Sequence, residues 1–116
     1  MATVDPRHFI PLTAAKFHIL AALSAGELHG YAIMQAVESS SDGLVRIGPA
    51  SLYGTLKRLV DEGLAEEVDR PAAPGEDARR RYYRLTGLGA LVLAAEAQRL
   101  ARLVDFARAH LEPGSA

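Results

Sequence analysis

The most constraining feature of this sequence is a short helix with a marked start and a marked stop, between Gly48 and Leu64. Pro49 stands at the start, where the backbone N–H that proline lacks would have no partner within the helix. Gly63 stands where a helix commonly ends in a left-handed residue. Between them an apolar stripe recurs at helical spacing, made of Leu52, Leu56, Leu59 and Val60. The pattern predicts a helix over about residues 49–62 with one buried side.

The opposite side of this helix is small, polar and basic. It carries Ala50, Gly54, Lys57 and Arg58, with Ser51 and Tyr53 on the flanks. Small residues let another surface come close, and cations can meet phosphates, so this side suits the major groove of DNA. Taken alone, the same pattern also fits an ordinary amphipathic helix with a solvated face.

The segments after this helix follow the order strand, loop, strand. Within residues 64–70, Leu64 and Val68 recur at even spacing, which suits a strand with one buried face. Residues 71–78 contain prolines and a glycine without apolar periodicity, so we expect a loop. Residues 79–85 carry aromatic side chains of high strand preference, which predicts a second strand.

This order is that of a winged helix-turn-helix, in which the tip of the hairpin lies along the DNA backbone. The second strand is rich in arginine: Arg79, Arg80, Arg81 and Arg84. These cations are predicted to contact phosphates. The alternative is a charged edge strand that prevents aggregation.

Several motifs carry a resemblance to a known family. They are the run from Leu12 to Leu23, His29-Gly30-Tyr31, Ser51 to Leu59, Glu62-Gly63-Leu64 and Arg81 to Gly89. Over roughly residues 10–90 the chain resembles the PadR family of bacterial transcriptional regulators. The resemblance implies a dimeric winged-helix repressor that is controlled by a small ligand or by stress, and it places Tyr53 near DNA. With one C-terminal helix the chain is similar to the short members.

The expected fold is mainly α, of the α+β class. Residues 1–11 form an N-terminal arm, 12–86 a winged helix-turn-helix DNA-binding domain, 87–111 a C-terminal dimerisation helix and 112–116 a tail. Within the domain, Thr13 caps a first helix that ends near Ser24, and a second helix runs from Tyr31 to about Ser39. Residues 25–30 are expected to form a turn, and residues 44–47 a small strand beside the wing.

The last helix, which Thr86 is expected to cap, has more apolar surface than one small domain can cover. One stripe keeps a spacing close to a heptad: Leu93, Ala97, Leu100, Val104, Ala107 and Leu111. A second set widens it: Leu88, Val92, Ala95, Leu103 and Phe106. We therefore expect the first stripe to pair with a second copy of the chain. The alternative is a terminal helix that folds back on its own domain.

Charge is an awkward point for a DNA-binding protein. The net charge is −1, whereas a basic domain is the usual expectation. Most of the anions between Leu44 and Leu85 are on the helix end and the first strand, which are expected to lie away from the DNA. Glu76 and Asp77 are exceptions, because they fall in the tip of the wing. They predict modest affinity for nonspecific DNA.

Enzyme and membrane functions find little support in the sequence. There is no cysteine, so a disulfide framework and a thiolate metal site are excluded. The histidines lack metal-ligand spacing, Ser51 lacks the Gly-x-Ser-x-Gly elbow, and His29 fits a turn or cap. No apolar run is long enough to span a bilayer and no signal peptide is evident. We expect a cytoplasmic protein without cofactor, metal site, catalytic residues or membrane partner.

The sequence thus predicts a DNA-binding transcriptional regulator, a repressor that acts as a homodimer on a palindromic operator. The candidate DNA-binding residues are Ser51, Tyr53, Gly54, Thr55, Lys57, Arg58, Arg79, Arg80 and Arg81. Its expected partners are double-stranded DNA and a second copy of the chain, with release by a small-molecule effector left open. Two alternatives remain: a winged-helix module that binds protein, and a dimer that binds a small ligand without specific DNA binding.

Overall fold

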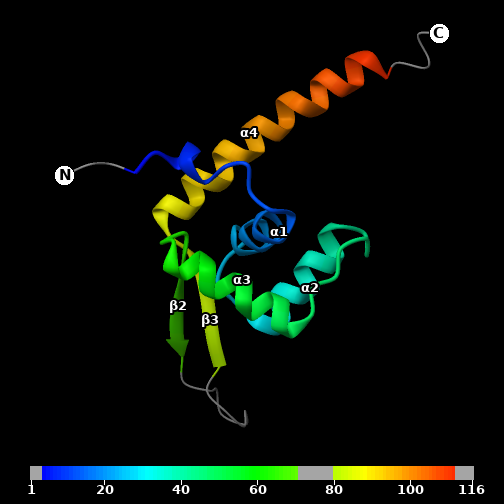
Figure 1. Cartoon of the computed structure of the whole chain (residues 1–116). Coiled ribbons are helices and arrows are strands. Elements are labelled where there is room, and N and C mark those ends of the chain that lie inside the picture. Colours follow the sequence, from blue (N-terminus) through cyan, green and yellow to red (C-terminus); the bar gives the residue numbers. More distant parts are fainter. Residues whose placement is uncertain (1–3, 71–79, 112–116) are drawn as a thin grey trace.

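Helices and a small antiparallel sheet combine into a winged helix-turn-helix in the computed structural model, which describes residues 4–70 and 80–111. The elements are η1 (Pro6–Phe9), α1 (Ala14–Leu23), β1 (Leu28–His29), α2 (Gly30–Ser40), α3 (Pro49–Asp61), β2 (Ala65–Arg70), β3 (Arg80–Leu85) and α4 (Gly87–His110). Helices α1 to α3 pack together beside the β2–β3 hairpin, and α4 leaves the domain on the side opposite to Arg70 and Arg80, where β2 ends and β3 begins (Figure 1). The α+β fold expected from the sequence is confirmed.

The apolar stripe of α3 lies in the centre of the hydrophobic core. Leu52, Leu56 and Leu59 are buried, while Val60 is half-buried at the edge. They pack with side chains from the other helices and the sheet: Ile19, Leu20, Leu23, Ile33, Val37, Leu64, Ala65, Tyr83 and Val92. Burial of one α3 side leaves its other side free to face a partner.

Local signals set the helix boundaries, as the sequence predicts. The hydroxyl of Thr13 accepts from the backbone N–H of Lys16 at 3.2 Å, and that of Thr86 accepts from Gly89 N–H at 2.9 Å. Each hydroxyl satisfies a helical N–H that has no partner within its helix. Gly63 has a φ of +80°, the left-handed conformation that ends α3.

The sheet differs from the sequence-based expectation in its third strand. Its order is β1-β3-β2, and β1 pairs Leu28 with Tyr83 and His29 with Tyr82. Residues 44–47, expected to be a strand beside the wing, form none, so that prediction is wrong. This segment has no strand partner among the described residues; instead, the Ser41 hydroxyl accepts a hydrogen bond from the N–H of Val45 and donates one to the Val45 carbonyl.

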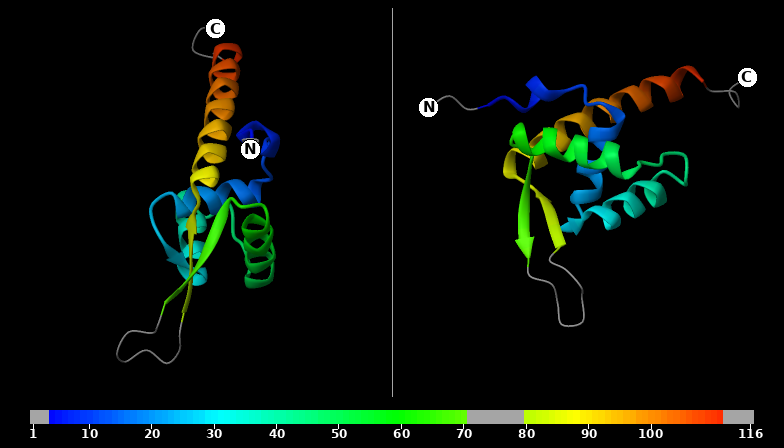
Figure 2. Two further views of the ribbon diagram at one scale, coloured as in Figure 1. Left: turned by 90° about the vertical axis from the view of Figure 1, so that its left-hand side faces the viewer. Right: turned by 60° about the horizontal axis from the view of Figure 1, so that its bottom comes forward.

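Helix α4 is anchored at its start and free along its outer half. The Thr86 hydroxyl donates to the Gly63 carbonyl at 2.6 Å, and the Thr86 N–H donates to the Leu64 carbonyl at 3.2 Å. The helix then extends away from the domain (Figure 2). Every residue from 101 to 111 is exposed in the single chain.

A buried carboxylate fixes the N-terminal arm against α4. Glu96 is 1 % exposed, and its Oε2 accepts from the backbone N–H of Leu12 at 2.6 Å. Arg99 donates to both of its oxygens, at 2.5 and 3.1 Å. The hydrogen bond from Arg99 is the main reason that the pKa of Glu96 is lowered, so this carboxyl group stays ionised at neutral pH. The arm includes η1, which packs along α4.

Candidate nucleic-acid interface

The free side of α3 holds most of the predicted DNA-binding residues together. Ser51, Tyr53, Gly54, Lys57 and Arg58 are exposed on it, and Thr55 is half-buried. No atom of a described residue lies within 4 Å of the position that a Cβ on Gly54 would take. This side of the helix is therefore open, small at its centre and basic toward its C-terminal end.

Tyr53 also connects α3 to the start of α2. A Cβ on Gly30, the first residue of α2, would overlap with the hydroxyl of Tyr53. The tyrosine is 47 % exposed, so its ring fixes the contact between the two helices while one side stays accessible. His29 precedes Gly30 and caps α2, since its Nδ1 accepts from the N–H of Ala32 at 3.3 Å. The expected capping role of His29 is confirmed.

The hairpin arginines do not all lie on one surface. Arg79 lies outside the described residues, and Arg80 is the first residue of β3. Arg81 is exposed, with its Nε 3.4 Å from Glu67 Oε1. Arg84 instead joins Glu66 at 2.6 Å and Glu27 at 3.3 Å, which ties the hairpin to the turn before β1. Arg84 is thus held by structural ion pairs.

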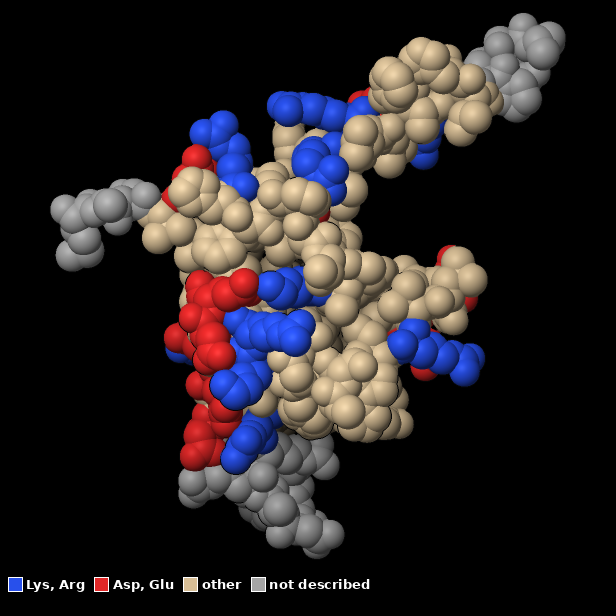
Figure 3. All heavy atoms as spheres, viewed as in Figure 1, with Lys and Arg blue, Asp and Glu red and all other residues tan. Residues whose placement is uncertain are grey.

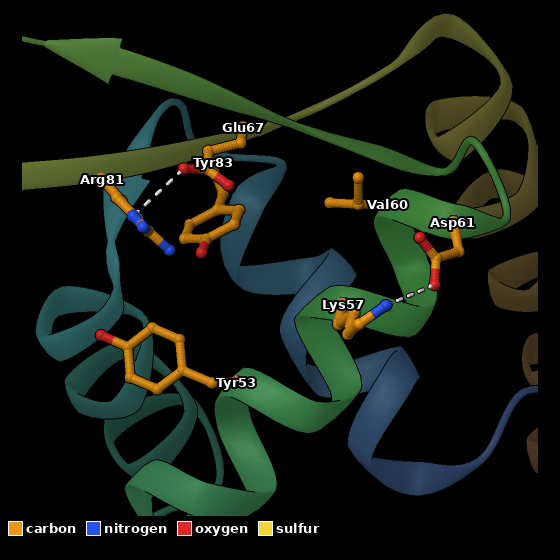
Figure 4. A pocket seen from close by; sticks show the side chains of 7 residues that line it. All are labelled: Tyr53, Lys57, Val60, Asp61, Glu67, Arg81 and Tyr83. Carbon is orange, nitrogen blue, oxygen red and sulfur yellow. Dashed lines mark hydrogen bonds and ion pairs between the residues drawn. The ribbon is translucent and has the colours of Figure 1, made fainter.

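An open groove of about 310 Å³ separates α3 from the hairpin (Figure 4). Its lining comes from both elements: Tyr53, Lys57, Val60, Asp61, Glu67, Arg81 and Tyr83. Tyr83 projects from β3 toward α3, and burial is the main reason that its pKa is raised. Its hydroxyl therefore stays protonated at neutral pH and can donate or accept a hydrogen bond.

Opposite charges stand side by side in this region (Figure 3). Lys57 Nζ lies 3.3 Å from Asp61 Oδ2, and Arg81 is paired with Glu67 as described above. The expectation that anions of the helix end and first strand lie away from this surface is wrong for Asp61 and Glu67. Alternation along β2 directs Glu67 to the same side of the hairpin as Arg81.

The predicted dimer stripe on α4 divides into two parts. Leu93 and Leu100 are half-buried, and Leu93 packs against the core of its own domain. Ala97, Val104, Ala107 and Leu111 are exposed. Leu103 and Phe106, which widen the apolar surface, are 50 % and 65 % exposed. The outer half of α4 therefore presents a broad apolar surface that its own domain does not cover.

Other kinds of site are not evident in the described part of the chain. Within residues 4–70 and 80–111, no three His, Cys, Asp or Glu side chains are grouped so that they could hold a metal ion. No helix in those same ranges is long and apolar enough to cross a membrane.

Comparison with known proteins identifies the family. The Transcriptional regulator PadR-like family matches residues 19–95, which include the second half of α1, all of α2 and α3, the whole sheet and the first part of α4. A relative from Streptomyces fradiae, an uncharacterised 37.1 kDa protein in transposon TN4556, is 44 % identical over 89 residues. The match covers 77 % of this chain and 24 % of that relative, so the chain spans about a quarter of its length.

Solved structures share the same fold. The Bacillus subtilis PadR structure in complex with operator DNA is 28 % identical, with a TM-score of 0.62 over 72 % of this chain and 46 % of that chain. A PadR-like transcriptional regulator from Bacillus cereus has a TM-score of 0.71 at 24 % identity, over 84 % and 90 % of the two chains. On the family match and the fold together, this chain belongs to the PadR-like family of transcriptional regulators.

Proposed function

We propose that this protein is a repressor that binds a palindromic DNA operator as a homodimer. The observation that carries the proposal is the free side of α3, which is open at Gly54 and basic at Lys57 and Arg58, next to the β2–β3 hairpin. In winged helix-turn-helix proteins such a helix enters the major groove. The similar Bacillus subtilis PadR, whose structure contains operator DNA, supports the same role.

Each part of the chain has a place in this proposal. Residues 12–86 are the DNA-binding domain, with α3 reading bases and the hairpin arginines Arg79, Arg80 and Arg81 holding the backbone. Residues 87–111 are the dimerisation helix, and residues 1–11 are an arm that Glu96 fixes to it through Leu12. Release by a small-molecule effector, in a site formed when two copies pair, completes the regulatory cycle that we propose.

Arg58 is the cation that we expect to read a base. It is exposed on α3 and makes no ion pair with another described residue, so no described carboxylate competes with DNA for it. Selection from random duplexes by the purified protein is expected to give a palindrome whose half-site centres are about one helical turn apart. The same selection with Arg58→Ala should lose preference at one position of each half-site, at a cost of about 1–3 kcal/mol.

Arg102→Ala is the matched control for this experiment, because Arg102 is exposed on the side of α4 opposite to the predicted dimer stripe. It removes the same charge far from α3 and should leave the selected sequence unchanged. A selection that enriches no sequence, while weak binding remains, would favour the alternative of a protein-interaction module. An Arg58→Ala variant that selects the original site would show that this arginine only contacts phosphate.

Gly54 offers a test of how closely α3 approaches DNA. A glycine inside a helix costs about 1 kcal/mol relative to alanine, and no described atom would contact the added methyl group. Gly54→Ala should therefore raise the free energy of unfolding by up to about 1 kcal/mol. It should at the same time weaken operator binding, because the methyl group stands between the helix and the groove floor. A variant that is more stable and binds equally well would show that Gly54 faces solvent in the complex.

A further inference from the structure

Two cations of the groove between α3 and the hairpin are already occupied by carboxylates of the same chain. Lys57 is paired with Asp61 along α3, and Arg81 is paired with Glu67 across the hairpin. All four side chains line one groove, and the dashed lines of Figure 4 mark both pairs. In the free protein each described cation that lines this groove therefore has an internal anion beside it.

These pairs are weak enough to open. The side chains of Lys57 and Arg81 are 77 % and 73 % exposed, and those of Asp61 and Glu67 are 63 % and 41 % exposed. Exposed ion pairs contribute little to stability, because water screens them and two long side chains must be held still. A DNA phosphate that enters the groove can therefore take over both cations. The displaced carboxylates stay close to the phosphate and repel it.

We propose that Asp61 and Glu67 limit the affinity of this protein for DNA by competing with a backbone phosphate for Lys57 and Arg81. The inference rests on the proposed DNA-binding function and assigns a role to residues that do not themselves hold DNA. Phosphate contacts carry no sequence information. Weakening them lowers the affinity for all duplexes alike, so the base contacts of α3 supply a larger share of the total. The net charge of −1 is consistent with a chain whose own carboxylates limit its affinity for DNA.

The neighbouring residue on β2 provides a matched control. Glu66 precedes Glu67 and points to the other face of the hairpin, where it pairs with Arg84. Asp105 is exposed on the outer part of α4. The double variant Glu66→Gln/Asp105→Asn thus removes the same two charges from the same kinds of residue, outside the groove.

The test is a titration of an unrelated duplex, and of the selected operator, with three proteins: the unchanged chain, Asp61→Asn/Glu67→Gln, and the control double variant. At about 50 mM salt the groove variant should bind about tenfold more tightly, and the slope of log K against log salt should steepen by about one to two units. The control should gain clearly less, because neither Glu66 nor Asp105 is paired with Lys57 or Arg81, the two cations of the groove. Glu67→Gln alone should give part of the gain, and circular dichroism checks that each variant is folded.

The outcomes separate this inference from the proposed function. If the unchanged protein binds duplex and the groove variant gains no more than the control, Asp61 and Glu67 do not compete with phosphate and the inference is wrong. A gain restricted to the selected operator would also overturn it, since a phosphate contact cannot distinguish sequences. If none of the three proteins binds duplex DNA, the proposed function fails, and the inference fails with it.

Discussion

Replacing Gly89 with Ala is expected to destabilise the protein strongly, although alanine is the better helix former. A Cβ at this position would overlap with the carbonyl oxygen of Leu64, where α4 crosses the end of the α3–β2 turn. Helix propensity favours the change by about 1 kcal/mol. Forcing a methyl group into a packed contact costs typically about 1–3 kcal/mol, and the neighbour here is backbone that cannot rotate away. The clash should dominate.

The measurement is thermal and denaturant unfolding, with Gly87→Ala as the control. Gly87 lies in the same first turn of α4, and a Cβ there would meet no described atom within 4 Å. The Gly89→Ala variant should melt several degrees below the unchanged protein, since 1 kcal/mol corresponds to about 4–8 °C in a domain of this size. Gly87→Ala should melt at the same temperature or slightly above. Equal melting of the two variants would mean that α4 can shift away from Leu64 at little cost.

Helix caps and the buried side of α3 are the features that the sequence alone could predict. Caps depend on a few adjacent residues, and Thr13, Thr86 and Gly63 all act as their local patterns predict. The stripe of α3 was equally predictable, because its period identifies the buried side. The close contact between Gly89 and Leu64 was not, since it depends on how two elements cross in space.

The parts that were missed depend on partners distant in the sequence. The two-residue strand β1 exists only because β3 lies beside it, so no local pattern distinguishes it from a turn. Glu96 looks like one charged residue of an exposed helix, yet its carboxylate is buried against the N–H of Leu12, 84 positions away. A charge inside an otherwise apolar stretch of helix was the only available signal.

The charged groove was missed for a related reason. In the hairpin register Asp69 lies opposite Arg81 and Glu67 lies opposite Tyr83. Glu67 is therefore the diagonal neighbour of Arg81 on the same face of the hairpin, and the two side chains form an ion pair. Composition shows that cations and anions are nearly balanced, but only the register shows which of them meet. Predicting the interface therefore needs the pairing of the strands as well as the residues on them.

The dimer seam that we propose depends on the part of α4 that extends beyond its own domain. Leu100 is half-buried in the single chain, so a charge there would also disturb contacts within the domain. Val104 is 45 % exposed and lies in the stretch from 101 to 111 where every residue is exposed. It shares the predicted stripe with Ala107 and Leu111, so it tests the seam without affecting the core.

Val104→Lys is expected to convert the dimer that we propose into a folded monomer. The change places a charge where two apolar helices meet, and desolvation of an unpaired ammonium group there is costly. Operator affinity should fall at least about a hundredfold, because the two α3 helices are no longer linked at a fixed spacing.

Ala109→Lys, on the other side of the same helix, is the control and should remain dimeric with normal binding. Sedimentation, circular dichroism and DNA titration on one sample measure the three properties. A Val104→Lys variant that stays dimeric and binds the operator normally would place the seam elsewhere, with Leu103 and Phe106 as the next surface of α4 to test.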